Sequence, residues 1–150
     1  MGLFNKKVSD IMTTDVEMVG PDTNLKTAAE TMRRLDVGVL PVGAGGNVRG
    51  IITDRDIVIR GVAEALDPLS TRVSELMTRD VVHCYEDQSI REAAQMMKDK
   101  QIRRLLIFSH DEKLVGVVSL GDLAVDYGDD KVSGQVLEKV SEPSAPKPKG

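Results

Sequence analysis

Apolar residues recur at helical spacing in two separate stretches of the chain. The first stretch carries Leu25, Ala28, Ala29, Met32 and Leu35, and the second carries Ile90, Ala93, Ala94 and Met97. Spacings of three and four residues place side chains on one face of a helix, so each stretch predicts an amphipathic helix. Residues that favour a helix start stand before both stretches, at positions 22–24 and 88–89.

Short apolar runs around these helices predict strands. A brief strand is expected before each helix, over residues 16–19 and 81–84. Two further strands are expected after each helix, at 37–42 and 48–53 in the first half and at 104–108 and 114–119 in the second. The connections between these later strands are rich in turn-forming residues and predict hairpins. A second helix is expected to begin after each hairpin, near Asp54 and near Leu120.

The whole order of elements occurs twice. Residues 8–16 (VSDIMTTDV) return as residues 73–81 (VSELMTRDV), and residues 50–56 (GIITDRD) return as residues 116–122 (GVVSLGD). A period this long that is present only twice does not predict a solenoid. It predicts an α/β (α+β) fold of two β-α-β-β-α repeats, packed about an approximate two-fold axis.

The repeat also sets the expected domain boundaries. We expect an N-terminal extension over residues 1–7, a first repeat over 8–65, a linker over 66–72 and a second repeat over 73–127. Residues 128–150 are expected to form a flexible tail, because the end of the chain is rich in proline and charge. Within this tail, residues 132–140 have the apolar spacing of a short helix.

Composition and charge narrow the classes of function. The chain has 20 basic and 24 acidic residues, a net charge of −4, and only 3% aromatic residues. It therefore lacks the basic surplus and the stacking aromatics that are typical of nucleic-acid binders. The single cysteine, Cys84, forms neither an intrachain disulfide nor a CxxC metal site. No signal peptide and no membrane-spanning run is evident, so a cytoplasmic protein without membrane partners is expected.

The most informative motif pairs a hydroxyl with an aspartate three residues later, where a strand is expected to end and a helix to begin. The two copies are Thr53 with Asp56 and Ser119 with Asp122. The first turn of a helix favours an anion, so the hydroxyl can bind a phosphate there while the carboxylate accepts hydrogen bonds from a ribose. The same pattern is close to a capping box, which is a purely structural interpretation. Because the motif occurs twice, each time three residues after a glycine, we favour nucleotide binding.

The chain resembles a tandem pair of CBS domains, the module named after cystathionine beta-synthase, and especially small stand-alone CBS-pair proteins of bacteria. The resemblance covers about residues 8–127. It rests on the two Gly-x-x-Thr/Ser-x-x-Asp motifs and on segments 8–13, 73–78, 37–42 (VGVLPV) and 102–105 (IRRL). It implies a non-enzymatic regulatory module that binds AMP, ADP or ATP, or alternatively NAD or S-adenosylmethionine, between the repeats. It also implies a homodimer that acts on an unidentified partner protein.

The resemblance further implies which residues contact the ligands. Thr53 would face the phosphate and Asp56 the ribose of one ligand. That site would be completed by Thr78 and Val82 along the adenine and by Ile102, Arg103 and Arg104. Ser119 and Asp122 would hold a second ligand, against Thr13, Glu17, Val37 and Gly38. Because two arginines stand beside the first site, we expect it to bind phosphate charge more strongly than the second.

Other functions stay open on the sequence alone. The main alternative is a structural interaction module whose clefts bind ligand weakly or stay empty, and an enzyme is the least favoured interpretation. His83 and Cys84 are neighbours on an expected strand and point to opposite faces, so no metal site is expected. The chain departs from the family where Leu106 replaces a proline and where Gly43-Ala44-Gly45 replaces an acidic residue.

Overall fold

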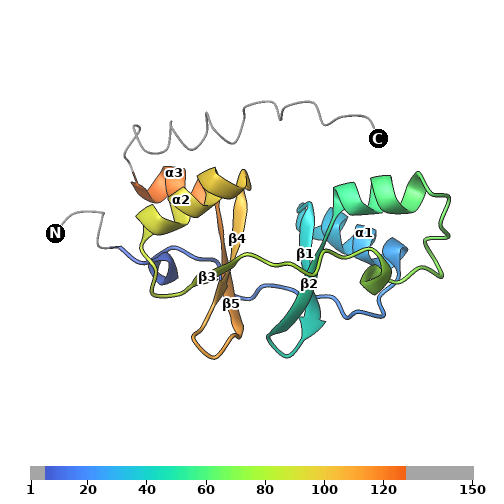
Figure 1. The fold of residues 1–150 in the computed structure, drawn as a ribbon, viewed down its shortest axis with the longest axis horizontal. Helices are drawn as coiled ribbons and strands as arrows, with labels where there is room; N and C mark the ends of the chain where they lie inside the picture. Colours follow the sequence, from blue (N-terminus) through green and yellow to red (C-terminus); the bar gives the residue numbers. More distant parts are fainter. Residues whose placement is uncertain (1–5, 128–150) are drawn as a thin grey trace. The chain divides into compact units, whose positions relative to one another are not determined.

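The computed structural model describes residues 6–127, which form two compact units. Unit 1 holds residues 6–14, 83–110 and 115–127, and unit 2 holds residues 15–82 and 111–114. Each unit combines helices with a small β-sheet (Figure 1), which confirms the expected mixed α and β class. The expected tail over residues 128–150, with its short helix, lies outside the described residues, as do residues 1–5 of the expected N-terminal extension.

Unit 2 is built on an antiparallel strand pair, β1 (Val39–Ala44) and β2 (Asn47–Thr53). Gly45 and Gly46 both have positive φ and form a two-residue turn between the strands, a conformation that glycine adopts without steric cost. The loop expected over residues 43–47 is therefore shorter, because β1 continues through Ala44. The brief strand expected over residues 16–19 is reduced to a single parallel bridge between Val19 and Val42.

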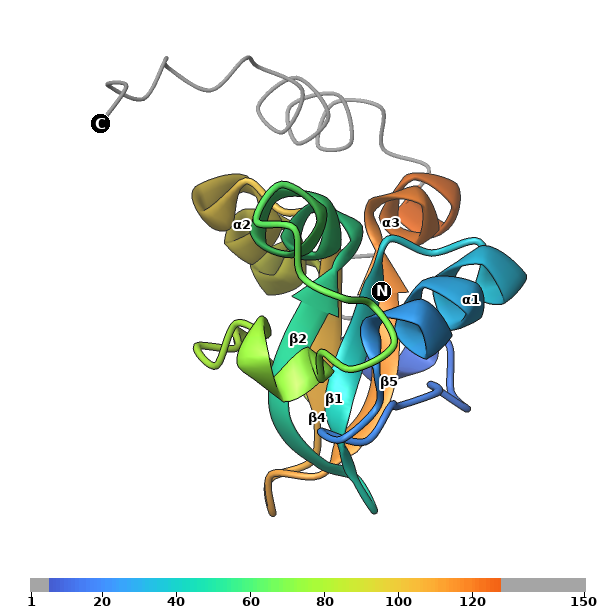
Figure 2. The ribbon, with the colours of Figure 1, turned by 90° about the vertical axis from the view of Figure 1, so that its right-hand side faces the viewer.

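Two helices flank this strand pair, α1 (Leu25–Leu35) in blue and the π-type helix η3 (Asp56–Val62) in green (Figure 2). The side chain of Asn24 caps α1 by accepting the Thr27 N–H at 2.8 Å. The predicted apolar face of α1 is buried at Leu25, Ala28 and Met32, whereas Ala29 and Leu35, expected on the same face, are exposed. The buried core of unit 2 joins α1, β1 and β2 through Leu25, Ala28, Met32, Leu40, Val42 and Ile52.

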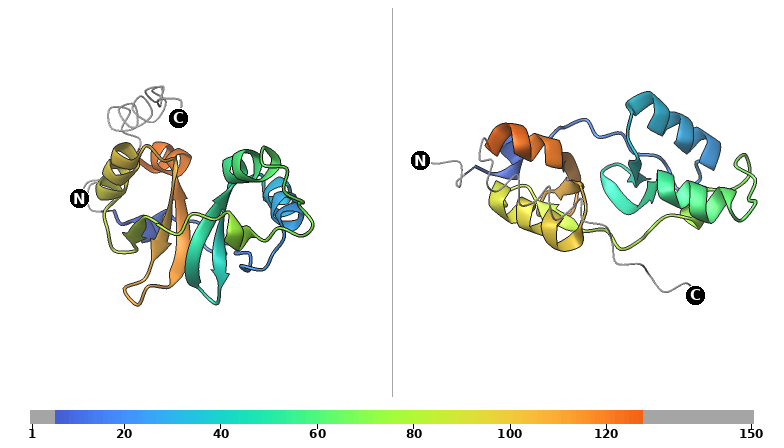
Figure 3. Two further views of the ribbon diagram at one scale, coloured as in Figure 1. Left: turned by 45° about the vertical axis from the view of Figure 1, so that its right-hand side comes forward. Right: turned by 90° about the horizontal axis from the view of Figure 1, so that it is seen from above.

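Unit 1 contains a three-stranded sheet in the order β3 (His83–Tyr85), β4 (Arg104–Phe108), β5 (Leu114–Ser119). The first two strands are parallel, with His83 opposite Leu106. Helices α2 (Ile90–Lys100) and α3 (Leu120–Tyr127) lie beside each other in this unit (Figure 3). The side chain of Ser89 caps α2 by accepting the Glu92 N–H at 3.0 Å. The apolar face predicted for α2 is buried: Ile90, Ala93, Ala94 and Met97.

Each unit also takes one short 3₁₀ turn from the start of the other repeat in the sequence. The turn η2 (Val8–Asp10) belongs to unit 1, where the Val8 N–H donates to the Gln88 carbonyl at 2.9 Å. The turn η4 (Val73–Glu75) belongs to unit 2, where the Val73 N–H donates to the Thr23 carbonyl at 2.8 Å. The sequence repeats and the compact units therefore differ in these two segments.

Candidate functional site

The two hydroxyl–aspartate motifs lie where the sequence predicted, at strand-to-helix junctions. Thr53 is the last residue of β2 and Asp56 the first of η3, and we call residues 53–56 the first junction. Ser119 is the last residue of β5 and Asp122 lies in the first turn of α3, and we call residues 119–122 the second junction. The first junction belongs to unit 2 and the second to unit 1.

At each junction the two residues cap one another. The Thr53 N–H donates to Asp56 Oδ2 at 3.0 Å, and the Asp56 N–H donates to Thr53 Oγ1 at 3.0 Å. The corresponding distances for Ser119 and Asp122 are 2.8 Å and 3.1 Å. This is the reciprocal arrangement of a capping box, so the structural interpretation of the motif is correct.

The caps leave polar atoms that a ligand can use. Each cap occupies one carboxylate oxygen and one lone pair of the hydroxyl, so Oδ1 of each aspartate and the hydroxyl hydrogen lie outside it. All four side chains are half-buried. Capping and ligand binding are therefore compatible at the same residues.

The backbone of the first junction is less open to an anion than the sequence suggested. The Asp54 N–H donates to the Gly38 carbonyl at 2.9 Å, and the Arg55 N–H donates to Asp54 Oδ1 at 2.8 Å. The Asp56 N–H is already engaged in the cap. With these three N–H groups committed, a phosphate at this turn would depend on side-chain donors such as the hydroxyl of Thr53.

A glycine before each junction is required by a neighbouring segment that approaches closely. Thr78 pairs with Ile51 of β2 through two backbone hydrogen bonds, of 2.8 and 2.9 Å. A Cβ added to Gly50 would lie 2.6 Å from the Thr78 carbonyl oxygen, a distance at which something must move. Thr13 pairs with Val117 of β5 in the same way, at 2.9 and 3.0 Å.

The sequence-predicted site residues are divided between the units. Thr78 and Val82 belong to unit 2 with Thr53 and Asp56, and Thr13 belongs to unit 1 with Ser119 and Asp122. The other predicted contacts belong to the unit that does not hold their junction: Ile102, Arg103 and Arg104 to unit 1, and Glu17, Val37 and Gly38 to unit 2. Their participation in the sites stays a prediction.

Gly38 and Arg103 occupy equivalent positions in the two units, since the backbone carbonyl of each accepts a hydrogen bond from the residue that follows the last strand. The Gly38 carbonyl accepts the Asp54 N–H at 2.9 Å, and the Arg103 carbonyl accepts the Leu120 N–H at 2.8 Å. Arg103 therefore has its backbone beside the second junction. In the part of the chain that the structure describes, the guanidinium groups of Arg103 and Arg104 are exposed and form no ion pair, so both are available to bind an anion.

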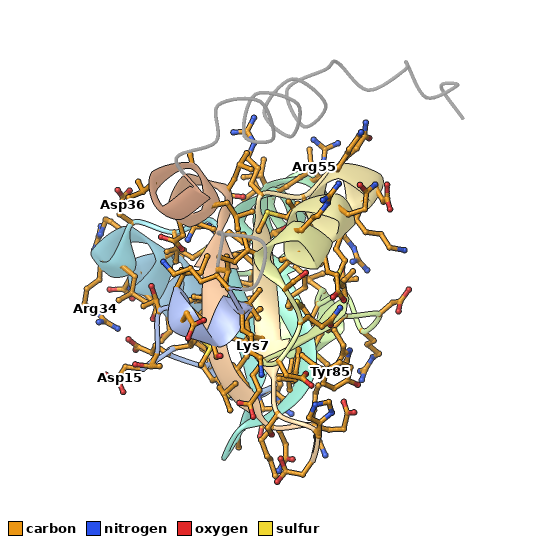
Figure 4. The ribbon with its side chains drawn as sticks, turned by 90° about the vertical axis from the view of Figure 1, so that its left-hand side faces the viewer. Lys7, Asp15, Arg34, Asp36, Arg55 and Tyr85 are labelled. Carbon is orange, nitrogen blue, oxygen red and sulfur yellow. The ribbon has the colours of Figure 1, made fainter. Side chains whose placement is uncertain are left out.

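Glu17 is already engaged inside unit 2. Its Oε1 lies 2.6 Å from Nη2 of Arg34, a residue that projects outward from α1 (Figure 4). Both side chains are exposed, so the pair adds little to stability. A ligand that used Glu17 would have to compete with this arginine.

Arg60 is a residue near the first junction that the sequence reasoning missed. Its Nη1 donates to the Leu76 carbonyl at 2.8 Å and lies 4.0 Å from Asp56 Oδ1. The signal was available, because a cation four residues after an acid on a helix is placed to interact with it.

An apolar groove of about 450 Å³ lies in unit 2 between α1 and η3. It is lined by Ala29, Met32, Arg33, Asp36, Val37, Gly38, Asp54, Ile57 and Val58. Two of the predicted ligand contacts, Val37 and Gly38, thus line a groove within their own unit. On the adjoining η3 helix Val58 and Val62 are 53% and 68% exposed, which marks an apolar face without cover.

The two histidines and the cysteine are engaged in packing, stacking or hydrogen bonding. Cys84 is fully buried, and burial, with a smaller contribution from Glu92, raises the pKa of its thiol to about 11. The exposed His110 lies 2.9 Å from Asp87, and its hydrogen bond lowers the pKa of that carboxyl below the ordinary value. The ring of His83 stacks on Phe108 with centroids 4.1 Å apart.

Residues 6–127 contain no cluster of three or more histidine, cysteine, aspartate or glutamate side chains placed to hold a metal ion. Over the same residues, none of the helices has the length and apolar character needed to cross a membrane.

Comparison with known proteins matches both halves of the chain to one family. A family model for the CBS domain matches residues 8–62 and again residues 73–127. The CBS domain-containing protein YhcV of Bacillus subtilis is 40% identical over 134 residues, which cover 89% of this chain and 94% of that protein.

Solved structures agree with this result. The crystal structure of Hypoxic Response Protein I with two coordinated zinc ions has a TM-score of 0.72 and 37% identity, covering 80% of this chain and 98% of that one. The crystal structure of CBSX2 in complex with AMP shares the fold, with a TM-score of 0.70 at 23% identity, covering 80% of this chain and 94% of that one.

Proposed function

The chain belongs to the CBS domain family, and on that premise we propose that it is a non-enzymatic regulatory module that binds adenosine-containing ligands at its two junctions. The observation that carries the proposal is the twin geometry of the junctions. Each presents a carboxylate oxygen and a hydroxyl hydrogen outside its cap, beside a segment held close by a glycine. These groups suit a ribose diol and a phosphate.

We propose AMP, ADP or ATP as the ligands, with NAD and S-adenosylmethionine as alternatives. Asp56 and Asp122 would accept hydrogen bonds from ribose hydroxyls, and Thr53 and Ser119 would each donate one to a phosphate oxygen. CBSX2, which shares the fold, contains AMP in its crystal structure.

Residues of the other unit would complete each site. Arg103 and Arg104 would bind the phosphates of the ligand at the first junction, since both are exposed and carry no ion pair among the described residues. Ile102 would pack beside them. Val37, Gly38 and Glu17 would contact the ligand at the second junction, and Glu17 would first have to leave Arg34.

A catalytic role is not part of the proposal. Cys84 is buried, and with a pKa of about 11 its thiol is protonated at neutral pH. A buried, protonated thiol is not a competent nucleophile. The ligand would act instead by favouring one conformation that a partner protein recognises, through its different affinities for the available states.

We also propose that the protein works in the cytoplasm as a homodimer. The occupant of the apolar face on η3 would be a second copy. The groove beside that face carries both signs of charge, with Arg33 and Asp36 on its rim, so two copies related by a two-fold axis could pair opposite charges. Light scattering on an eluting column peak tests this. A dimer that Val58→Glu converts to monomer is expected, and a wild-type monomer would contradict it.

A structural interaction module is the second candidate function, and the exposed side chains of Val58, Ile59 and Val62 favour it. Thermal unfolding of nucleotide-free protein separates the two. A ligand at 100 times its dissociation constant adds about 2.7 kcal/mol, which raises the midpoint by roughly 5–10 °C for a chain of this size. A rise with an adenine nucleotide is expected. No rise with any adenosyl ligand at millimolar concentration would favour the interaction module.

A further inference from the structure

The guanidinium of Arg60 adjoins both the first junction and the segment that leads to Thr78, and the proposed function uses both. Arg60 Nη1 lies 4.0 Å from Asp56 Oδ1, the carboxylate oxygen outside the cap. The same atom donates to the carbonyl of Leu76 at 2.8 Å. Leu76 leads directly into Thr78, which pairs with β2. Arg60 thus stands between the carboxylate assigned to the ribose and the segment assigned to the adenine.

The sequence does not repeat this residue. The position that corresponds to Arg60 in the second repeat is an aspartate, Asp126. A carboxylate has the opposite charge to a guanidinium and only accepts hydrogen bonds. The two motifs are alike in their caps and differ in the sign of the charge four residues after the aspartate.

We infer that Arg60 determines the ligand charge that the first junction accepts, favouring an adenosyl ligand with a 5′-phosphate over uncharged adenosine. This inference rests on the proposed function. Without Arg60, the half-buried carboxylate of Asp56 would present an unbalanced negative charge to a ligand that is itself an anion. The arginine offsets that charge, so the phosphate meets less repulsion while the ribose still finds Oδ1. Since the Arg60 side chain is 50% exposed, solvent moderates the effect.

A purely mechanical role for Arg60 makes a different prediction. If the guanidinium only braced Leu76 against η3, its loss would displace Thr78 and weaken every adenosyl ligand alike. A lysine would keep the charge but replace the guanidinium that donates to Leu76, so the two roles respond differently to it. The ratio of two affinities, for a charged and an uncharged ligand, therefore separates the two roles.

The experiment measures dissociation constants of AMP and of adenosine by titration calorimetry. All variants carry Asp122→Asn, which keeps the cap acceptor of the second junction while removing the carboxylate that would bind a second ribose. Arg60→Gln and Arg60→Lys are compared with Lys26→Gln. The control removes a cation from another i,i+4 pair, with Glu30 at 3.0 Å on α1, whose lysine is 57% exposed.

Arg60→Gln is expected to raise the dissociation constant of AMP about tenfold and that of adenosine less than about threefold. Arg60→Lys is expected to keep the preference for AMP, and Lys26→Gln to change neither constant. An unchanged ratio in Arg60→Gln, or an equal loss for both ligands in the two Arg60 variants, would overturn the inference. If the Asp122→Asn parent binds neither ligand, the failure lies with the proposed function itself.

Discussion

Replacing Gly50 by alanine tests the close approach between β2 and the segment that carries Thr78. The added Cβ would lie 2.6 Å from the Thr78 carbonyl oxygen and 3.0 Å from the sulfur of Met77. Rotation of a side chain can relieve the second contact but not the first, because the first is with backbone. The strand pairing must therefore shift, and with it the two hydrogen bonds between Ile51 and Thr78.

The expected cost follows from these contacts. Overpacking costs about 1–3 kcal/mol, and each weakened backbone hydrogen bond adds about 0.5–1.5 kcal/mol. With both hydrogen bonds weakened, Gly50→Ala should therefore lower the free energy of unfolding by about 2–6 kcal/mol. Gly116→Ala should cost less, since its closest contact, at 2.5 Å, is the sulfur of the flexible Met12 side chain.

Denaturant unfolding measures both effects. Gly20→Ala is the matched control, because its nearest atom would be 3.9 Å away and its φ is not in the left-handed region. That control also reports the gain of about 0.4–1 kcal/mol that alanine brings by restricting the unfolded chain. If Gly50→Ala were as stable as Gly20→Ala, the segment would not lie where the structure places it.

Three further predictions concern single side chains. Asp122→Ala should cost about 0.5–2 kcal/mol in urea unfolding through loss of the cap, whereas Asp122→Asn keeps an acceptor and should cost less; equal losses would argue against the cap at Ser119. Cys84 should resist alkylation at pH 8 in the native protein and react only after unfolding, since its pKa of about 11 and its burial suppress the thiolate; labelling as fast as a free thiol would contradict this. His110→Ala should raise the pKa of Asp87 toward its ordinary value in an NMR titration, because the His110 hydrogen bond is the main cause of its lowering. Since the pKa of Asp87 is depressed in the folded protein, the stability that its carboxylate contributes is present at neutral pH and is lost as the pH falls through that pKa. An unmoved pKa of Asp87 would refute the assigned cause.

The helices could be predicted because their signals are local. The apolar spacing that starts at Leu25 and at Ile90 marks the first residues of α1 and α2, and Asn24 and Ser89 cap them as helix-start residues do. The strand-to-helix junctions were equally local, since a hydroxyl and an aspartate three residues apart define both the cap and the proposed site. For such elements, neighbours in the sequence are also neighbours in space.

The assignment of η2 and η4 to units could not be predicted. Val8 and Val73 are both fully buried, but nothing in the sequence around them indicates which sheet buries them. That choice depends on contacts distant in the sequence, such as Val8 with Gln88. The role of Gly50 was hidden for the same reason, because the atom that excludes a Cβ belongs to Thr78.

The chemistry of the site was predicted only in part. The motif alone left capping and ligand binding as alternatives, and the structure shows the cap while leaving Oδ1 of each aspartate outside it. The open N–H groups expected at the first junction are occupied, because Gly38 and the Asp54 side chain accept two of them. These acceptors become visible only once the backbone path is known.

The central claim is that Asp56 and Asp122 each hold an adenosyl ligand, and calorimetric titration of nucleotide-free protein with AMP tests it most directly. The wild type is compared with Asp56→Asn, Asp122→Asn and the double variant, all of which retain a cap acceptor. The account predicts that each single change weakens binding about tenfold or more at one site, and that the double variant binds no AMP. Unchanged binding in the double variant would contradict the claim, because the ligand would then be held elsewhere.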